Sequence, residues 1–490
     1  MSPINDLPGF YPSIKDGGLG ALPSLNVSVF GVIGVAAAGE TVPKVLADLN
    51  AVVEEYEMGT LVEHLLDAMT CGARQIVVLR AAASVADVVG TPTKTGTGLA
   101  TATADLQTDV TDVKADRNHK FLITVGGALA DAKYKYSNNN GITYSEEKSF
   151  VVTTPGPPAK AKIDLDDGTY IEFTNDVTTP DDSFVAEDIW VLANTEPKMN
   201  STDLAAALDV LAAYKDSNGT GLPMIYITAS GDETVWAALG AKADEIWTNE
   251  QRPIWFLVNS EPPDYTDIDT WITGLVASSA LYRHNRVCVN AFYGRLRDTR
   301  GNLLVRAGGG CLVGLAAKAK LHWSIGWVRQ MVLANCIGIE PYNTDDDQMD
   351  LSRISQLNDA RFVTGRHWSG YGRVPTDDWM MAAATSDFFC IRNRRIMDAA
   401  ITGVQLANMP FINEPGVAQE DMIAYKLDLE RPLVALQDEK IIMGFTLTLT
   451  PDTNIWTNGI VHATIEIIPT PTKKKLVATF QLKTGTAASA

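Results

Sequence analysis

Strand-like and helix-like segments alternate in two separate parts of this chain, and that alternation limits its possible folds more than any other feature. Apolar, strand-like runs at 224–227, 254–258 and 287–289 are each preceded by a segment of helical periodicity. Residues 27–80 show the same rhythm, with helical periodicity predicted from 42 to 56, after a Thr41 cap, and from 61 to 69. Strands joined by helices of this length lie parallel, with right-handed crossovers. The two parts therefore predict one α/β core domain.

The residues between these two parts have a different pattern. From 120 to 193, short runs of alternating apolar and polar residues are separated by turn sequences such as 138–141 (NNNG) and 166–168 (DDG). This pattern is typical of a small all-β sandwich. We therefore predict a β-sandwich inserted into the α/β core, after a linker at 90–109 that lacks periodicity.

Both ends of the chain differ from the core. Residues 1–24 contain four prolines and no apolar period, which predicts an extended arm. After helical periodicity at 386–408 and 417–430, strand-like runs follow near the C-terminus. The predicted fold class is α/β and α+β multidomain, with these parts: an N-terminal arm at 1–24, a discontinuous α/β core at 25–110 and 198–345, an inserted Ig-like β-sandwich at 111–197, a C-terminal α+β domain at 346–468 and a C-terminal strand arm at 469–490.

Composition argues against several functions. The 40 Lys and Arg residues against 59 Asp and Glu give a net charge of −19, which repels phosphate backbones and makes nucleic acid an unsuitable partner. The five cysteines are widely spaced among apolar residues, so we expect buried, reduced thiols and synthesis in the cytoplasm. The start has no signal-peptide pattern, and the apolar stretch near 27–38 is too short and glycine-broken for membrane insertion.

No local pattern identifies a catalytic, cofactor-binding or metal-binding residue. The segment 91–96 (TPTKTG) lacks the glycine that a phosphate-binding loop needs before its lysine, and close helix packing explains the glycines at 308–310 better than a dinucleotide does. The acidic run 345–350 lacks the glycine and glutamate of a calcium loop, and no two of the six histidines have the spacing of a helical zinc site. We therefore predict no catalytic residues, no cofactor and no metal.

Two segments near the C-terminus are candidates for protein contacts. Arg392, Arg394 and Arg395 lie on one predicted helix, as either a solvated basic face or a docking surface for an acidic partner. A terminal segment after three lysines is either an ordinary edge strand or a strand donated to the sheet of another subunit. That segment is Leu476, Val477, Ala478, Thr479, Phe480, Gln481 and Leu482.

Several stretches resemble the sheath proteins of contractile phage tails. The matching sequences are 357–364 (LNDARFVT), 377–382 (DDWMMA), 386–398 (SDFFCIRNRRIMD), 59–63 (GTLVE) and the glycine-rich 308–319. The inserted block, with 133–137 (KYKYS) and 184–188 (FVAED), is similar to the Ig-like insertions of phage virion proteins.

This resemblance implies a non-enzymatic subunit of a virion tail or a related injection machine, assembled in the bacterial host cytoplasm. Sheath subunits polymerise as stacked hexameric rings around an inner tube and contract to drive that tube through the target cell envelope. The implied partners are further copies of this chain, the inner tail tube protein, and the baseplate and tail terminator proteins. The resemblance also implies exchange of terminal strands, and it makes the three arginines or the 417–430 helix candidates for contact with the tube.

Two other functions remain compatible with these residues. A cytoplasmic α/β enzyme with a β accessory domain would gather polar groups in a concave site at the carboxyl ends of its parallel strands. A virion-surface protein would use the sandwich to bind carbohydrate or host proteins. Deletion of 111–197 separates the last function from a sheath, which is expected to tolerate the loss.

Overall fold

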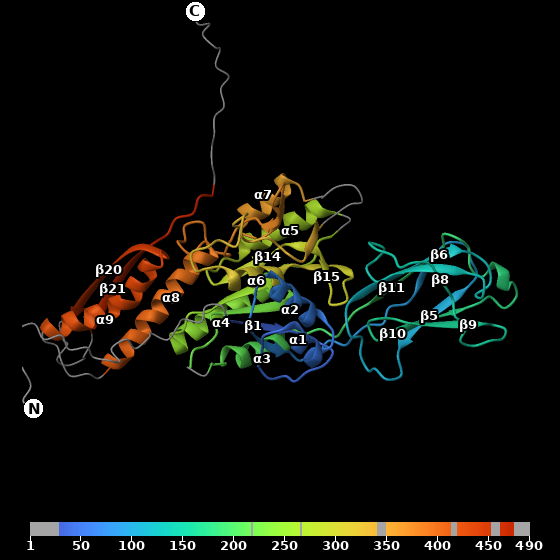
Figure 1. The fold of residues 1–490 in the computed structure, drawn as a ribbon, viewed down its shortest axis with the longest axis horizontal. Coiled ribbons are helices and arrows are strands. Elements are labelled where there is room, and N and C mark those ends of the chain that lie inside the picture. Colours follow the sequence, from blue (N-terminus) through green and yellow to red (C-terminus); the bar gives the residue numbers. More distant parts are fainter. Residues whose placement is uncertain are drawn as a thin grey trace, which may run out of the picture.

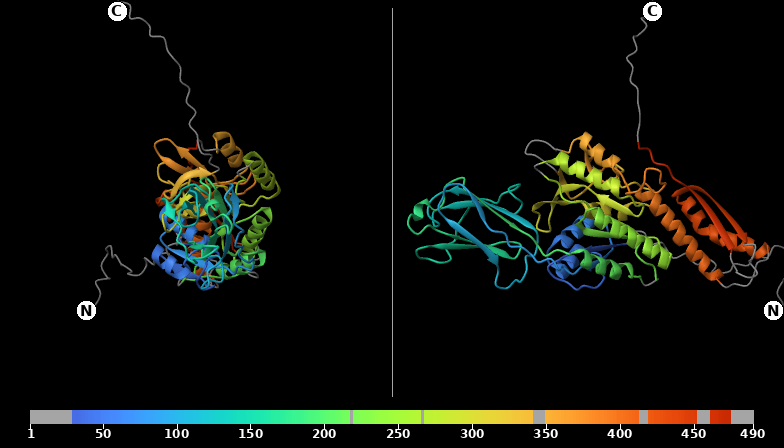
Figure 2. Two further views of the ribbon diagram at one scale, coloured as in Figure 1. Left: turned by 90° about the vertical axis from the view of Figure 1, so that its right-hand side faces the viewer. Right: turned by 180° about the vertical axis from the view of Figure 1, so that it is seen from behind.

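Three bodies lie in a row along the chain in the computed structural model, which describes residues 29–216, 219–264, 267–340, 349–412, 419–451 and 461–474. A β-sandwich occupies one end, the α/β core lies in the middle, and a lobe of helices and one β-hairpin forms the other end (Figure 1). The view from behind shows the same row, and in the view from the end the three bodies lie one behind another (Figure 2). The predicted arm at 1–24 lies outside the described residues, and so do residues 475–490 of the predicted arm at 469–490, which include the candidate strand 476–482.

A six-stranded sheet, in the order β14-β13-β12-β1-β3-β2, forms the middle of the core. All neighbours are parallel except β2, which pairs antiparallel with β3. Ile33 of β1 pairs with Leu79 of β3 on one side and with Ile227 of β12 on the other, so both separate parts of the chain build one sheet. The strands are β1 (Phe30–Gly34), β2 (Lys44–Leu46), β3 (Ile76–Arg80), β12 (Met224–Ser230), β13 (Trp255–Asn259) and β14 (Val287–Asn290).

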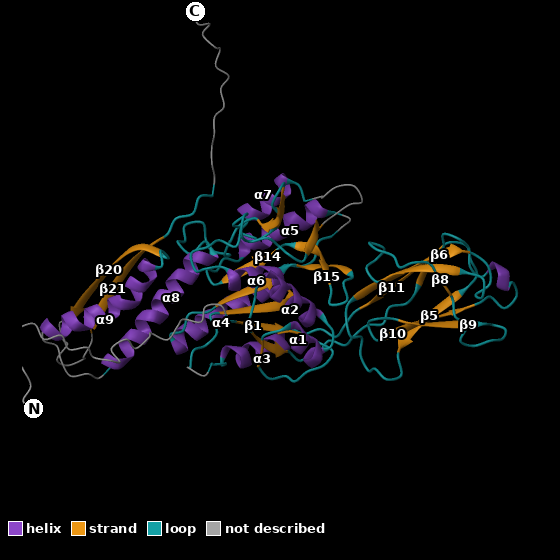
Figure 3. Cartoon of the chain, in the orientation of Figure 1, coloured by secondary structure: helices purple, strands orange, loops and turns teal. Residues whose placement is uncertain are grey.

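Helices cover both faces of this sheet (Figure 3). They are α1 (Leu49–Tyr56), α2 (Thr60–Cys71), α3 (Ser201–Ala212), α4 (Glu233–Glu250), α5 (Ile268–Leu281) and α6 (Gly309–Lys318). The mixed α/β class predicted from the alternating segments is confirmed, since apolar runs such as Trp255–Asn259 are fully buried between two helical layers.

The segment 42–56 is not one helix, and this prediction was wrong. Lys44–Leu46 pairs with the free edge of β3, and the helix begins only at Leu49. Asp48, not Thr41, caps it, because an Asp48 carboxylate oxygen accepts a hydrogen bond from the Ala51 N–H at 2.9 Å. Pairing along a sheet edge thus overrides the apolar period of the first residues.

The inserted sandwich consists of two antiparallel sheets, β5-β10-β9 and β4-β11-β6-β7-β8. Phe121, Phe173 and Phe184 are completely buried between them. The strands, with one short 3₁₀ helix, are β4 (Thr93–Thr95), β5 (Thr101–Leu106), β6 (Arg117–Val125), β7 (Lys133–Ser137), β8 (Lys148–Ser149), β9 (Lys160–Asp164), β10 (Thr169–Thr174), η1 (Pro180–Asp182) and β11 (Ile189–Asn194).

The predicted boundaries of this sandwich need a correction. Strands β4 and β5 lie inside 90–109, which the sequence marked as a linker. Their alternating Thr and Ala side chains carry too weak an apolar period to be recognised, yet β5 pairs along its whole length with β10. The actual connections are two short segments that pair with each other, Val85 with Lys198 and Val88 with Thr195. The sandwich is therefore held on a two-stranded ribbon.

The predicted start of the C-terminal domain at 346 is also wrong. Leu357, Phe362 and Met381 are buried in the same apolar cluster as the parallel sheet, so this stretch belongs to the core. Its elements are β15 (Tyr293–Arg297), β16 (Leu303–Ala307), β17 (Cys336–Glu340), α7 (Leu351–Asp359), β18 (Gly365–Trp368) and β19 (Gly372–Pro375). The C-terminal lobe has its own cluster and comprises α8 (Ile391–Asn408), η2 (Met409–Phe411), α9 (Gln419–Asp438), β20 (Ile442–Pro451) and β21 (Val461–Pro469).

Helices α2 and α6 pack backbone to backbone at two glycines. A Cβ atom on Gly310 would lie 2.4 Å from the His64 carbonyl oxygen, and one on Gly314 would lie 2.2 Å from the Ala68 carbonyl oxygen. This close approach explains Gly310 by helix packing, as predicted for the glycines at 308–310, and it gives Gly314 the same role.

Replacing Gly314 with alanine is expected to destabilise the core by about 1–3 kcal/mol, because a backbone carbonyl cannot move aside as a side chain does. The matched control is Gly274→Ala in the interior of α5, where nothing lies within 4 Å of the added Cβ. That change is expected to stabilise the chain by up to about 1 kcal/mol, through helix propensity alone. Denaturant unfolding of both variants measures the difference, and equal effects would contradict the packing explanation.

Candidate assembly surface and domain junction

The β-hairpin of the C-terminal lobe has two open edges. Strands β20 and β21 pair with each other, with Leu447 opposite Ile465 and Phe445 opposite Ile467. These four side chains are at least partly buried in the apolar cluster of the lobe, which includes α8 and α9. Among the described residues, no further strand pairs with either outer edge. An isolated two-stranded sheet is marginally stable, and its open edges can each accept another strand.

Helix α9 carries an apolar stripe that no described part of the chain covers. Ile423, Leu427 and Val434 are 55%, 62% and 43% exposed, and their spacing places them on one face of the helix. The opposite face, with Leu429 and Leu433, is buried in the lobe. An apolar stripe of this kind on an otherwise packed helix is typical of a protein contact.

The C-terminal segment leaves the lobe and returns to the core. After β21, the Thr470 hydroxyl donates a hydrogen bond to the Lys440 carbonyl oxygen at 2.8 Å. Lys474 then donates from Nζ to an Asp377 carboxylate oxygen at 2.7 Å, and Nζ lies 3.9 Å from the centre of the Trp379 ring. These contacts fix the end of the described chain, Lys474, against the core.

Arg392, Arg394 and Arg395 do not form an exposed face, so the proposed basic docking surface was wrong. The three side chains are 4–6% exposed. Arg392 pairs with Asp378 at 3.2 Å, Arg394 donates from Nε to Asp398 at 2.8 Å, and Arg395 donates from Nη2 to the Ala319 carbonyl oxygen at 3.1 Å. The spacing of Arg394 and Asp398, four residues apart, is the sequence signal that could have indicated this ion pair within one helix.

The buried position of Asp378 also shifts the pKa of its carboxyl group. Burial, together with the neighbouring Asp377, raises the pKa of Asp378 to about 7, although Arg392 opposes this shift. Removing Arg392 would leave this carboxyl buried without its cation, so the arginine stabilises the start of α8 rather than a contact with a partner.

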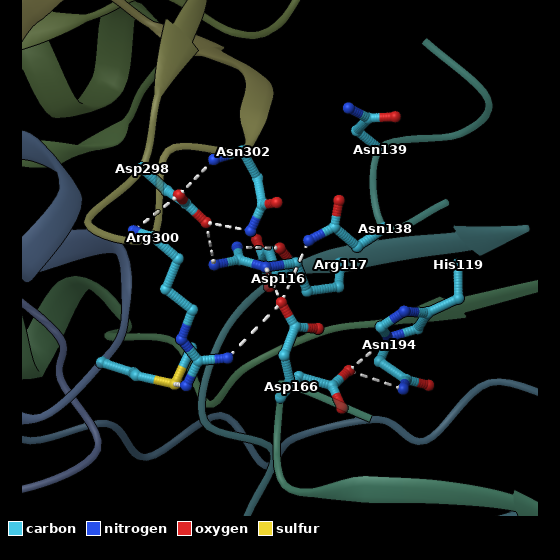
Figure 4. Close-up of polar contacts among 12 residues, drawn as sticks. Asp116, Arg117, His119, Asn138, Asn139, Asp166, Asn194, Asp298, Arg300 and Asn302 are labelled. Carbon is cyan, nitrogen blue, oxygen red and sulfur yellow. Dashed lines mark hydrogen bonds and ion pairs between the residues drawn. The ribbon is translucent and has the colours of Figure 1, made fainter. Parts of the chain in front are cut away.

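A second group of charges joins the sandwich to the core (Figure 4). Arg117 at the start of β6 is 4% exposed and donates to a Glu63 oxygen of α2 at 2.7 Å. Its guanidinium also lies 3.9 Å from Asp166 of the sandwich and 4.0 Å from Asp298, in the turn between β15 and β16. Arg300, in that same turn, reaches Asp166 at 3.8 Å.

These charges continue into the core. Arg306 pairs with Asp67 at 2.8 Å and with the other Glu63 oxygen at 3.6 Å. Burial alone would lower the pKa of Arg306, but the nearby Asp67 and Glu63 raise it above its usual value. A chain of buried ion pairs therefore links the sandwich through α2 to the sheet of β15 and β16. Such ion pairs fix how the sandwich sits on the core more strictly than apolar burial alone would.

Sequence reasoning missed this junction entirely. The partners of Arg117 come from three elements far apart in the chain, and no local spacing connects them. The burial of an arginine at the start of a strand is visible only when the elements are folded.

Glu196, on the segment that returns from the sandwich, caps helix α2. Its carboxyl oxygens accept from the Thr60 N–H at 3.1 Å, and the Thr60 hydroxyl also contacts it. Burial and the nearby Asp116 raise the pKa of Glu196 to about 8. Between about pH 4.3, the pKa of a glutamate carboxyl in the unfolded chain, and about pH 8, the folded state keeps this proton while the unfolded chain releases it.

Because the folded pKa is raised, the stabilisation from this proton is complete below the unfolded pKa and is lost as the pH rises through about 8. The Glu196→Gln variant lacks this titration, so its stability relative to the wild type should increase from about pH 5 to about pH 9, by roughly 1–3 kcal/mol. Denaturant unfolding across this range measures the change. Glu54→Gln, at an exposed position of α1, is the control and should show no such trend.

We searched the described residues for metal-binding groups, reactive cysteines and membrane-spanning helices. Within these ranges, no group of three or more His, Cys, Asp or Glu side chains could hold a metal ion. All five cysteines are buried and free. No helix in the described part is long and apolar enough to cross a membrane. At the carboxyl edge of the parallel sheet, buried Asn259 donates to the Tyr226 hydroxyl at 2.9 Å and accepts from Asn290 at 2.9 Å, in a packed network.

Comparison with known proteins gives both a family and a fold. The family model described as DUF2586, N-terminal domain, matches residues 11–373. No curated protein sequence matches this chain.

Solved structures with a similar fold include the following three. The helical sheath of the anti-feeding prophage in the contracted state is 11% identical, with a TM-score of 0.55 over 98% of this chain and 99% of that one. The sheath tail protein of Desulfitobacterium hafniense is 13% identical, with a TM-score of 0.50 over 94% and 100%. The contracted sheath complex of the PVC extracellular contractile injection system is 9% identical, with a TM-score of 0.51 over 96% and 98%. The resemblance to sheath proteins expected from the sequence is thus confirmed in the fold.

Proposed function

Because this chain belongs to the DUF2586 family and has the fold of tail sheath proteins, we propose that it is the structural subunit of a contractile sheath. The single observation that best supports this function is the hairpin of β20 and β21, whose two edges find no partner among the described residues. A subunit with acceptor edges at one site and a donor strand at another makes a heterologous contact. Such a contact repeats into an open helical assembly.

In this proposal, copies assemble as stacked hexameric rings around an inner tube. Residues 476–482 of one copy add to a free hairpin edge of another, and Leu476, Ala478, Phe480 and Leu482 set the register with their alternating side chains. Lys474, held at Asp377, gives each donated strand a fixed starting point on its own core. About sixteen residues follow that point, and an extended chain of this length reaches roughly 50 Å.

Contraction is a rigid-body movement of subunits from a metastable extended packing, with the exchanged strands as tethers that stay joined. It needs no nucleotide or other cofactor, and the chain acts without catalysis. The exposed stripe of Ile423, Leu427 and Val434 on α9 contacts the inner tube protein. The other partners are the baseplate and tail terminator proteins of a virion tail assembled in the host cytoplasm.

Electron microscopy of the purified chain tests this function. We expect hollow cylinders or stacked rings with six-fold symmetry, because the strand contact alone joins neighbouring copies. A chain that stays monomeric at high concentration, without tube or baseplate, would contradict a self-assembling sheath.

The alternative function, a surface-binding protein, depends on the sandwich and is tested by deleting it. The structure suggests a deletion that removes the whole sandwich at its connecting ribbon instead of only 111–197. Val88 and Thr195 pair across the connecting ribbon, so a two-residue Asn-Gly turn placed directly between Val88 and Thr195 closes it. The deletion variant should also carry Glu63→Gln, since Arg117 is removed. Cylinders should still form if the chain is a sheath, whereas loss of target-cell binding with intact cylinders would identify an adhesive role for the sandwich.

A further inference from the structure

A cavity of about 770 Å³ separates the core from the C-terminal lobe. Its floor is formed by the amino ends of two parallel strands, at Met224 of β12 and Trp255 of β13. Its opposite wall is one side of α8, where Thr402 and Leu406 line it. The cavity lies at the amino edge of the sheet, away from the packed network of Asn259 at the carboxyl edge.

Two buried polar atoms in the wall of this cavity have no hydrogen-bond partner in the described parts of the chain. Arg395 Nη1 is a hydrogen-bond donor and Asp398 Oδ2 is an acceptor, and neither has a hydrogen bond among the described residues. Both residues line the cavity and are more than nine-tenths buried. They lie three positions apart on α8, so a donor and an acceptor point from adjacent places on one helix. Buried polar atoms are normally satisfied, so their occupant is expected to supply both an acceptor and a donor.

The first strand of the sheet begins beside this cavity. Gly31 pairs with Ile225, so Phe30 lies level with Met224 at the amino edge. The residues before Val29 therefore enter the fold one strand away from β12, which is about 5 Å. Residues 17–28 (GGLGALPSLNVS) carry no charged side chain and include three leucines. Extended, these twelve residues reach roughly 40 Å, well beyond the width of two strands.

We propose that residues 17–28 of the same chain occupy this cavity, with their leucines against its apolar walls. An extended backbone presents C=O and N–H groups in alternation, which matches the unpartnered Arg395 donor and Asp398 acceptor. A purely apolar ligand would leave both atoms unsatisfied. The segment thereby joins the core to α8 and sets how the C-terminal lobe is held, independently of any assembly between copies.

Hydrogen–deuterium exchange on the full, unassembled chain tests this proposal. Thr402→Trp fills the cavity, and Thr273→Trp on α5 is the matched control, since each threonine hydroxyl donates to the carbonyl four residues earlier, at 2.9 and 2.8 Å. We expect the amides of 17–28 to be protected in the wild type and the control, and to exchange at least tenfold faster in Thr402→Trp. Peptides from α8 and α9 report whether the lobe stays folded. Unprotected wild-type amides, or equal protection in all three proteins, would overturn the proposal.

A cysteine pair provides an independent readout that does not fill the cavity. Leu22→Cys with Leu406→Cys should form a disulfide within one chain, while Leu22→Cys with Leu281→Cys, at an exposed end of α5, should not. The native cysteines are buried and do not compete. A disulfide that forms only between two chains would assign the cavity to a neighbouring copy, and no disulfide would assign it to solvent or another ligand. Either result would contradict the proposal.

Discussion

Truncation after Lys474 should abolish the assembly of cylinders while leaving the single chain folded. The truncated chain keeps the Lys474 contact with Asp377 and all elements of the lobe, so its unfolding transition should be unchanged. It loses residues 475–490, which in the proposed assembly supply the strand that completes a neighbouring hairpin. Electron microscopy and sedimentation measure polymer, and circular dichroism measures folding. Cylinders in the truncated protein would contradict strand donation.

A pair of single substitutions makes the same test without changing chain length. Phe480 and Gln481 are adjacent, so a strand places their side chains on opposite faces. Phe480→Asp places a charge on the face that packs into the acceptor and should reduce the polymer fraction at least tenfold. Gln481→Asp adds the same charge to the other face and should leave most assembly intact. Equal effects of the two substitutions would indicate that net charge, not strand register, controls assembly.

Replacing Arg117 with methionine should cost about 3–5 kcal/mol of stability, the cost of removing one partner from a buried ion pair. Methionine keeps much of the apolar stem but leaves Glu63, Asp166 and Asp298 without their shared cation. Because these carboxylates come from both sides of the junction, the sandwich should also lose its fixed attachment to the core. Denaturant unfolding measures the stability, and proteolysis of the ribbon at 81–92 measures the attachment.

Arg300→Met is the matched control for the junction. Arg300 reaches the same Asp166, at 3.8 Å, but its side chain is 51% exposed, so water screens the pair. This change should cost only about 0–1 kcal/mol and leave proteolysis unchanged. If both variants lost equal stability, the burial of Arg117 would not be the reason for its effect.

The strands and helices of the core were predictable because their signals are local. Segments such as Ile225–Ile227 and Trp255–Val258 are apolar throughout and mostly β-branched or aromatic, and each is joined to the next by a segment of helical period. Right-handed crossovers then leave few ways to arrange them. Weak signals mislead: the sequence predicts a linker where the Thr and Ala strand β5 lies, because the strand is stabilised mainly by its pairing with β10.

The environments of the candidate contact residues were harder to predict than the strands and helices, because they depend on the tertiary structure. Three arginines on one helix suggest an exposed basic face, but the folded chain places Asp378 and the core carbonyl of Ala319 against them. The same limit applies to Arg117, whose partners come from α2 and from the turn between β15 and β16.

The sequence by itself thus determined the classes of element, the insertion of an all-β domain into an α/β chain, and the resemblance to sheath proteins. Only the tertiary structure decided which charges are buried, where the sandwich begins, and that the hairpin of β20 and β21 keeps both edges open. The physical reason is distance along the chain. Apolar periodicity acts between residues a few positions apart, whereas ion pairs and strand neighbours join residues whose separation no local pattern records.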